Sequence, residues 1–267
     1  MEETPNFGQN ESLKPEEVGD GLEKVRIVPV EELIPDINKK GTQRIESVDY
    51  ETDNFSTNYV DNFFEQHINL VLDDPELLGV LKEKTKGQIL IDLGSSDATT
   101  GYTVSVLLGF KGYIGVDKFL GKSLKHRLGN VTMESIKERY LNMIGLDCFD
   151  AIKDKSLIDA LKSRSAEVLS ETQLIPASTV EEDMLTFLQR LPDDSVCVLT
   201  SGLNVINYNY SKEVAKELQR VISPAGMWMT FSSGMLSHGN MKNILGDTFG
   251  YDFDSENFSG VGFYVKE

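Results

Sequence analysis

Apolar and polar positions between residues 87 and 117 fall into blocks that predict a strand, a turn, a helix and a second strand. The apolar run at residues 89–91 suits a strand buried on both faces, as in a parallel sheet. A loop of small residues follows, and residues 98–109 carry apolar side chains at the spacing of a helix with one buried face. The second strand, residues 113–116, completes the first half of a nucleotide-binding α/β unit.

The loop after the first strand and the end of the second strand carry candidate ligand-binding residues. Small side chains at Gly94, Ser95 and Ser96 let a ligand approach the backbone closely, beside the amides of the helix start. Asp117 ends the second strand, where a carboxylate can accept hydrogen bonds from both hydroxyls of a ribose. Asp92 stands before the turn and another acid stands within it, which favours a ligand with an ammonium group over a pyrophosphate.

The pattern Asp92-x-Gly94-x-Ser96-x-Ala98 resembles the first motif of the class I methyltransferases, which use S-adenosylmethionine. Asp92 and Gly94 match that motif, and Asp117 matches the ribose-binding acid of the family. Ser96 and Ala98 replace the later glycines of the family. The resemblance implies S-adenosylmethionine as cofactor. A buried strand and a glycine turn without a ligand is the alternative interpretation.

Further apolar runs predict the rest of the same sheet. We expect strands at residues 172–175, 196–200 and 227–231, a helix at 211–221, and an antiparallel hairpin within 252–266. The resemblance covers about residues 87–267. It implies an α/β fold with a Rossmann-like, seven-stranded, mostly parallel sheet and helices on both faces.

The resemblance also assigns residues near the ends of the third and fourth strands. Asp183 and Met184 match the pair that contacts adenine, and Ser201 lies at the active-site end of the fourth strand. Asn204 follows as the candidate catalytic residue, because its amide can hold the hydroxyl or amine of an acceptor; alternatively, it caps the following turn. The candidate substrate-binding residues are aromatic: Tyr59, Phe63, Tyr208 and Tyr210.

Three segments lie outside this core pattern. Residues 1–22 are acidic with little to bury, which predicts a mobile tail. Residues 23–86 predict an N-terminal arm and a helical cover. Residues 25–33 could form a short strand or an extended arm, kept at a sheet edge by Pro29, and the helices at 58–82 close over the cofactor or simply pack in the core. The connection at about 120–172 predicts a helical insertion after the second strand, with two or three helices: 132–143, 148–161 and a weak segment toward residue 169. The insertion shapes substrate choice or pairs the subunits of a homodimer.

Composition narrows the partners and the chemistry. The chain has 43 acidic and 26 basic residues, a net charge of −17, which disfavours DNA or RNA as a substrate. Cys148 and Cys197 are far apart in apolar surroundings, which is typical of reduced core residues in a cytoplasmic protein. We expect no membrane span and no metal site, because neither a long apolar run nor a metal-ligand spacing occurs.

These patterns and the resemblance together predict an enzyme that transfers a methyl group from S-adenosylmethionine to a small-molecule acceptor. The runner-up hypothesis is a protein of the same fold that acts without catalysis, as a regulatory or assembly subunit. A nicotinamide dehydrogenase is weaker, because the loop at residues 94–98 lacks the glycines of a pyrophosphate-binding turn.

Overall fold

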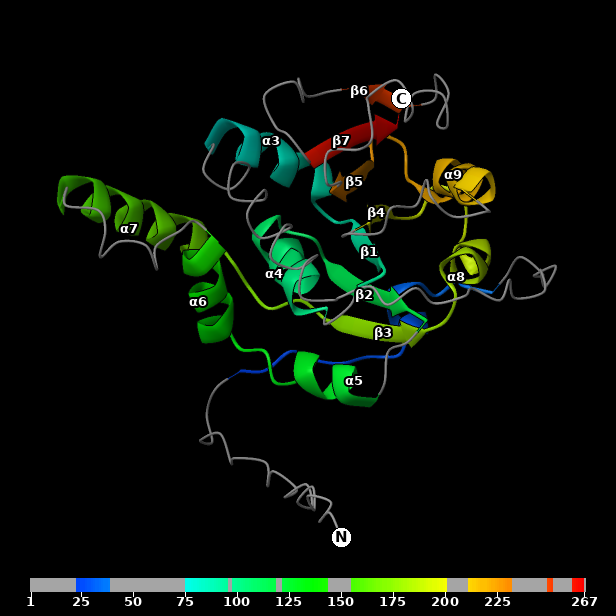
Figure 1. The fold of residues 1–267 in the computed structure, drawn as a ribbon, viewed down its shortest axis with the longest axis horizontal. Helices are drawn as coiled ribbons and strands as arrows, with labels where there is room; N and C mark the ends of the chain where they lie inside the picture. Colours follow the sequence, from blue (N-terminus) through cyan, green and yellow to red (C-terminus); the bar gives the residue numbers. More distant parts are fainter. Residues whose placement is uncertain are drawn as a thin grey trace, which may run out of the picture.

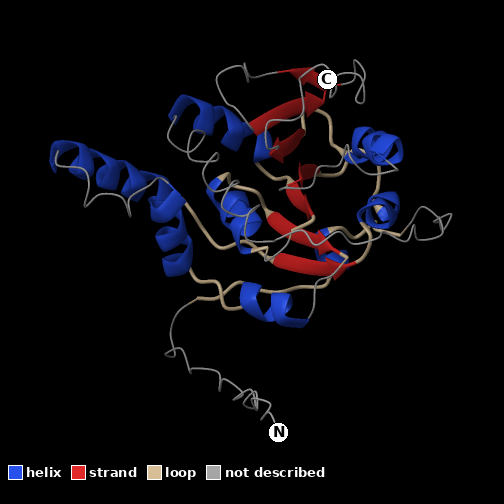
Figure 2. Ribbon diagram, in the orientation of Figure 1, coloured by secondary structure: helices blue, strands red, loops and turns tan. Residues whose placement is uncertain are grey.

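The computed structural model of this 267-residue chain describes residues 23–38, 75–95, 98–118, 122–143, 155–200, 211–231, 249–251 and 261–266. The described core is a β-sheet with helices against both of its faces (Figure 1, Figure 2). The predicted α/β, Rossmann-like architecture is therefore confirmed for the parallel part of the sheet.

The parallel strands have the order β3-β2-β1-β4-β5, and their bounds are β1 Ile89–Leu93, β2 Gly112–Asp117, β3 Ala177–Glu181, β4 Cys197–Thr200 and β5 Met227–Phe231. Beyond β5 the sheet continues with antiparallel pairs, first to β7 (Val261–Lys266) and then to β6 (Phe249–Tyr251). The winding reverses between β1 and β4, and open α/β sheets bind ligands at the carboxyl ends of their strands at such a switch point. We therefore expect a ligand-binding site at the carboxyl ends of β1 and β4.

Successive side chains of a strand point to opposite faces, and each face of this sheet has its own core. Leu90 packs in one core, while Ile89 and Ile91 pack in the other. Helices α3 (Pro75–Thr85), α4 (Thr99–Leu107) and α6 (Met133–Met143) contribute to the first core. Helices α1 (Val30–Leu33), α8 (Met184–Arg190) and α9 (Ser211–Val221) contribute to the second. Burial on both faces explains why β1 and β4 are continuous apolar runs.

The prediction of the third strand at residues 172–175 was wrong, because β3 is Ala177–Glu181. The apolar side chains of Leu174 and Ile175 pack against the first core from the approach to the strand. The backbone of Ile175 is also held by a side chain, since the Tyr102 hydroxyl donates to its oxygen at 2.8 Å and accepts from its nitrogen at 3.1 Å. The apolar residues Leu174 and Ile175 therefore pack against the core before the strand, and the more polar segment 177–181 forms the edge strand.

Other boundaries also shifted. The helix predicted at 148–161 is observed as α7 (Lys155–Ser170), which joins α5 (Lys122–Leu128) and α6 in the connection between β2 and β3. The hairpin prediction began too late, because β6 ends at Tyr251. Residues 1–22 and the first part of the predicted cover, 58–74, lie outside the described residues, and the last part of the cover is observed as a helix, α3.

An N-terminal arm, residues 23–38, runs along the edge of the sheet. Its first part pairs with the insertion, where the Val25 amide donates to the Val131 oxygen at 3.1 Å. Its next part pairs with the start of β3, where the Val28 amide donates to the Ala177 oxygen at 2.8 Å. Pro29 is the N-cap of α1. The extended conformation predicted for residues 25–33 is therefore wrong for residues 30–33, which form this helix. A proline is well placed there because its missing amide would have no helical partner.

Cys197 is a free cysteine buried in the first core, as the sequence predicted, whereas Cys148 lies outside the described residues. Burial raises the pKa of the Cys197 thiol to about 11, against a smaller opposite effect of the Met227 amide. Such a thiol is protonated near neutral pH and is a poor nucleophile. Among the described residues, no helix is both long enough and apolar enough to cross a bilayer.

Candidate functional site

The loop after β1 turns over the end of β2. The amides of Gly94 and Ser95 both donate to the Val116 oxygen, at 2.8 and 3.2 Å. Gly94 has a φ of 71°, a left-handed conformation that a glycine adopts without the steric penalty of a side chain. The sequence therefore places a glycine where the chain must reverse direction at the carboxyl edge of the sheet.

Ser95 has a buried hydroxyl for which the described part of the chain provides no hydrogen-bond partner. The residue is only 4% exposed, and its Oγ is the buried side-chain polar atom that finds no hydrogen bond among the described residues. The hydroxyl lies over Gly115 of β2, where an added Cβ would come within 3.0 Å of Ser95 Oγ and 3.3 Å of the Ala98 Cβ. An unsatisfied buried hydroxyl costs about 1–3 kcal/mol, so this hydroxyl calls for an explanation.

Asp92 is fully buried and is held by a neighbouring strand. Its Oδ2 accepts a hydrogen bond from the Tyr113 hydroxyl at 2.7 Å. The same oxygen faces helix α4, because a Cβ added to Gly101 would lie 2.0 Å from it. Asp92 therefore links β1, β2 and α4, and its predicted contact with a cofactor remains a prediction.

Two buried tyrosines support this arrangement. The rings of Tyr102 and Tyr113 meet edge to face, with centroids 5.7 Å apart. Burial raises the pKa of Tyr102 above its usual value, and the backbone of Ile175 opposes this more weakly. The Tyr102 hydroxyl is consequently protonated at neutral pH and acts as a structural donor to the Ile175 oxygen.

Helix α4 begins beside this loop, and its N-cap residue has no side chain that could cap it. Its N-cap residue is Ala98, which has a left-handed φ of 58° and donates its amide to the Ser95 oxygen at 2.6 Å. In the first turn, Arg139 of α6 donates from Nη1 to the Thr100 Oγ1 at 2.5 Å. The positive end of the α4 dipole and a guanidinium thus lie together at the carboxyl edge of the sheet.

The ends of β2 and β3 bring the predicted nucleoside-binding acids close together. Asp117 is paired in register with Glu181, and its backbone oxygen accepts from the Glu182 amide at 3.3 Å. Asp183 caps α8, because its side chain accepts from the Leu185 and Thr186 amides at 3.0 and 3.2 Å. A helix N-cap is one reason for an acid at this position, and the adenine contact predicted for Asp183 remains a prediction.

Met184 is half-buried and packs against the second core. The structure therefore brings Asp92, Gly94, Ser95 and Asp117 to one edge, with Asp183 and Met184 following β3. The remaining predicted residues lie outside the described part of the chain: Tyr59, Phe63, Ser96, Ser201, Asn204, Tyr208 and Tyr210.

Sequence reasoning missed several residues that shape this edge. Tyr113 of β2 bonds Asp92 of β1, and Arg139 of α6 bonds Thr100 of α4. Trp228, the single tryptophan, donates from Nε1 to the Oγ1 of Thr200 at 3.1 Å, at the last residue of β4. The only signal for these residues in the sequence is that Trp228 is the single tryptophan of the chain. Within the described ranges, His, Cys, Asp and Glu side chains form no group of three or more placed to hold a metal ion.

No protein-family model matches the sequence, and no curated protein matches it. Similar solved structures include a SAM dependent methyltransferase from Aquifex aeolicus, at 15% identity and a TM-score of 0.44, covering 80% of this chain and 100% of that chain. A TehB-like SAM-dependent methyltransferase from Corynebacterium glutamicum has 12% identity and a TM-score of 0.38, with coverages of 79% and 100%. A methylase of a ribosomal protein from Lactobacillus delbrueckii has 11% identity and a TM-score of 0.40, with coverages of 72% and 77%.

Proposed function

We propose that this chain binds S-adenosylmethionine at the carboxyl edge of β1 and β2 and transfers its methyl group to a small-molecule acceptor. The observation that carries the proposal is the buried hydroxyl of Ser95 over Gly115, which has no partner among the described residues and lies in the loop where a Rossmann-like sheet binds its ligand. A hydroxyl can donate to or accept from a ligand, so the site fits a group with both kinds of polar atom.

The backbone of the loop supports the same proposal. Ala98 stands where the resembled family has a glycine, yet it keeps the left-handed φ of 58° that a glycine adopts readily. A non-glycine residue in this conformation costs about 1 kcal/mol or more and persists where the surroundings require it. Ala98 therefore has a backbone conformation that a glycine at this position would adopt without strain.

Residues of the chain would hold the cofactor in named places. Ser95 and the start of α4 would bind its amino-acid end, and Asp117 would bind the ribose hydroxyls. When bound, the cofactor supplies an electrophilic methyl group on a sulfonium. The protein contributes position and exclusion of water, because an in-line displacement gains most from an acceptor held in line and desolvated. Asn204 is the residue proposed to hold that acceptor, covered by aromatic residues: Tyr59, Phe63, Tyr208 and Tyr210.

Ser95→Ala should change stability and affinity in opposite directions. Removing an unsatisfied hydroxyl should raise the unfolding free energy of the free protein by about 1 kcal/mol. The same change should weaken binding of S-adenosylhomocysteine by about tenfold, because a hydrogen bond to the ligand is lost. Thermal unfolding and calorimetric titration measure the two effects.

Ser195→Ala is the matched control. The Ser195 hydroxyl donates to the Pro192 oxygen at 2.9 Å, and the residue lies before the amino-terminal end of β4, away from the candidate site. This control should not gain stability and should bind as wild type does. A Ser95→Ala protein with unchanged affinity would remove Ser95 from the site.

Asp117→Ala should weaken S-adenosylhomocysteine by roughly 1.5–3 kcal/mol, the range of hydrogen bonds to a charged group. Glu181→Ala removes the same charge from the paired position of β3, and Glu181 is exposed, so this variant should bind within twofold of wild type. Equal losses in both variants would show that only the charge of the edge matters and that Asp117 does not hold the ribose.

A second candidate function is favoured by the replacement of glycines at Ser96 and Ala98, namely a subunit of the same fold that does not catalyse. The two proposals differ in turnover. A catalyst converts S-adenosylmethionine to S-adenosylhomocysteine when a pool of small nucleophiles is supplied, whereas a regulatory subunit binds either nucleoside or neither and produces none.

A further inference from the structure

Helix α5 carries an exposed basic surface in a chain that is acidic as a whole. Residues 118–133 contain four Lys or Arg residues and no Asp or Glu, whereas the net charge of the chain is −17. Three consecutive residues of α5 form the basic surface and are exposed: Lys125, His126 and Arg127. Within the described ranges, neither Lys125 nor Arg127 takes part in an ion pair. This surface is therefore free to attract a group of negative charge.

The N-terminal arm is bonded to the chain directly after α5. The Val131 amide donates to the Leu128 oxygen at 3.1 Å, and the Val131 oxygen accepts from the Val25 amide at 3.1 Å. Lys24 forms an antiparallel bridge with Thr132. The arm accordingly runs beside α5 (Figure 1). The residues that precede the arm in sequence are thus attached next to the basic surface of α5.

Residues 1–22, the acidic tail, carry the opposite charge. They contain six Asp or Glu residues and one Lys. Glu16 and Glu17 come eight and seven residues before Lys24, and eight residues of extended chain span up to about 26–29 Å. Helix α5 has seven residues, which corresponds to a length of about 10 Å. The carboxylates of the tail can therefore reach the whole basic surface from the point where the arm is attached.

We propose that the acidic tail docks on the basic surface of α5 within the same chain. An electrostatic contact needs no apolar burial, which suits the composition of the tail. A single ion pair at a surface is weak, but several act together on a tethered segment, because the tether raises the effective concentration of the tail. The docked tail would cover a surface that otherwise attracts polyanions, and it would favour the paired position of the arm.

Carbodiimide cross-linking of the whole chain, followed by mass spectrometry, tests this contact. The reagent adds no spacer, so it joins a carboxylate to an amine only where the two touch. We expect cross-links from Glu16 or Glu17 to Lys125 at low salt, and a yield about fivefold lower or less in about 0.5 M NaCl, where charges are screened beyond ~4 Å. Lys266 and Asp194 provide the internal reference, because they form an ion pair and the Lys266 ammonium is also held by a backbone oxygen.

Arg127→Glu keeps the reacting amine of Lys125 and reverses a neighbouring charge, so it should also lower the yield of these cross-links about fivefold or more. Lys216→Glu is the matched control. It changes the net charge by the same amount at an exposed position of α9, on the side of the sheet where the second core lies. This control should keep the yield within about twofold of wild type.

A mixture of nitrogen-15-labelled and unlabelled protein separates docking within one chain from docking on a second copy. Docking within the chain predicts that both cross-linked peptides carry the same label. Mixed labels would overturn the proposal in favour of a second copy. A yield that responds neither to salt nor to Arg127→Glu would overturn it by showing chance encounters of the tail. If no cross-link reaches Lys125, the proposal is also wrong, and the basic surface is open to a separate anionic partner.

Discussion

Gly101→Ala is expected to destabilise the protein by about 2–4 kcal/mol, although alanine is the better helix former. An alanine Cβ would lie 2.0 Å from Asp92 Oδ2 and 3.0 Å from the Tyr113 hydroxyl. Asp92 is fully buried, so it can make room only by giving up the 2.7 Å hydrogen bond from Tyr113. The loss of that bond and the overpacking together exceed the gain in helix propensity, which is about 1 kcal/mol.

The same substitution at Gly79 is the control. Gly79 lies within α3, and nothing lies within 4 Å of a Cβ added there. Gly79→Ala should therefore stabilise the protein by about 0.5–1 kcal/mol. Thermal or urea unfolding of the two variants should give opposite signs. In a Tyr113→Phe background, Gly101→Ala should cost less, because the bond that it breaks is already gone. A Gly101→Ala protein as stable as wild type would contradict the placement of Asp92.

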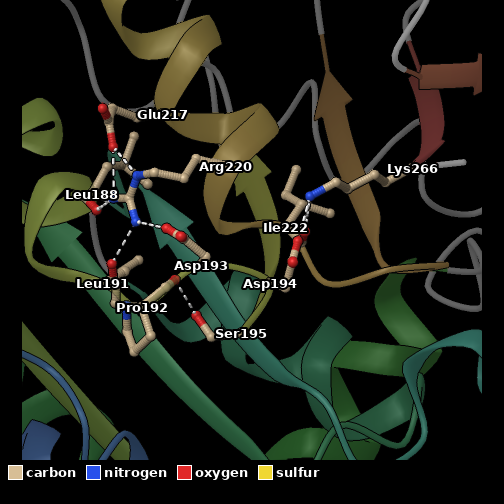
Figure 3. A network of polar contacts seen from close by, with 10 residues as sticks. All are labelled: Leu188, Leu191, Pro192, Asp193, Asp194, Ser195, Glu217, Arg220, Ile222 and Lys266. Atoms are coloured by element: carbon tan, nitrogen blue, oxygen red, sulfur yellow. Dashed lines mark hydrogen bonds and ion pairs between the residues drawn. The ribbon is translucent and has the colours of Figure 1, made fainter.

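Arg220→Met is expected to lower the unfolding free energy by about 2–4 kcal/mol, or the melting temperature by about 5–12 °C. Arg220 lies in α9 and its side chain is 23% exposed. The guanidinium bonds the Leu188 and Leu191 oxygens at 2.8 and 2.7 Å, and it pairs with Asp193 at 2.7 Å and Glu217 at 2.6 Å (Figure 3). A methionine keeps much of the packing but leaves these acceptors without their donor.

Two comparisons make this prediction specific. Arg127 is exposed on α5, so Arg127→Met should change stability by less than about 0.5 kcal/mol. The Arg220 network lies near the amino-terminal ends of β4 and β5, whereas the candidate site lies at the carboxyl ends of the strands. Arg220→Met should therefore keep the wild-type affinity for S-adenosylhomocysteine at a temperature where it is folded. Unchanged unfolding would mean that the network contributes nothing to stability.

The parts of the fold that could be predicted are those where local sequence decides the structure. Strands buried on both faces are short apolar runs, which is why β1 and β4 were found, and α9 has the periodicity of an amphipathic helix. Strand β3 was missed because it lies at the edge of the sheet and has the sequence Ala-Ser-Thr-Val-Glu, with its last residue exposed. The nearby run of Leu174 and Ile175 was the stronger apolar pattern but packs before the strand.

The candidate site divides in the same way. The spacing of residues along the sequence was enough to predict part of the site, because a strand, a turn and the next strand form one local unit. These residues are Asp92, Gly94, Ser95 and Asp117. The hydrogen-bond partner of Asp92 could not be predicted from the sequence, because Tyr113 lies 21 residues later and contacts Asp92 only when β1 and β2 pair. Arg139 is 39 residues from Thr100 and reaches it through the packing of α6 on α4, for which no local pattern exists.

The N-terminal arm has a consequence for the order in which this chain can fold during synthesis. Its residues leave the ribosome before those of the sheet, but Ile27 and Val28 pair with Ala177, which is made after β1, β2 and the helices of the insertion. The arm cannot dock until that late segment has emerged, and closing so long a loop carries an entropic penalty that other contacts must first offset. The arm is thus made before β3 but can pair with it only afterwards, and the outer edge of β3 lacks these backbone bonds until the arm docks.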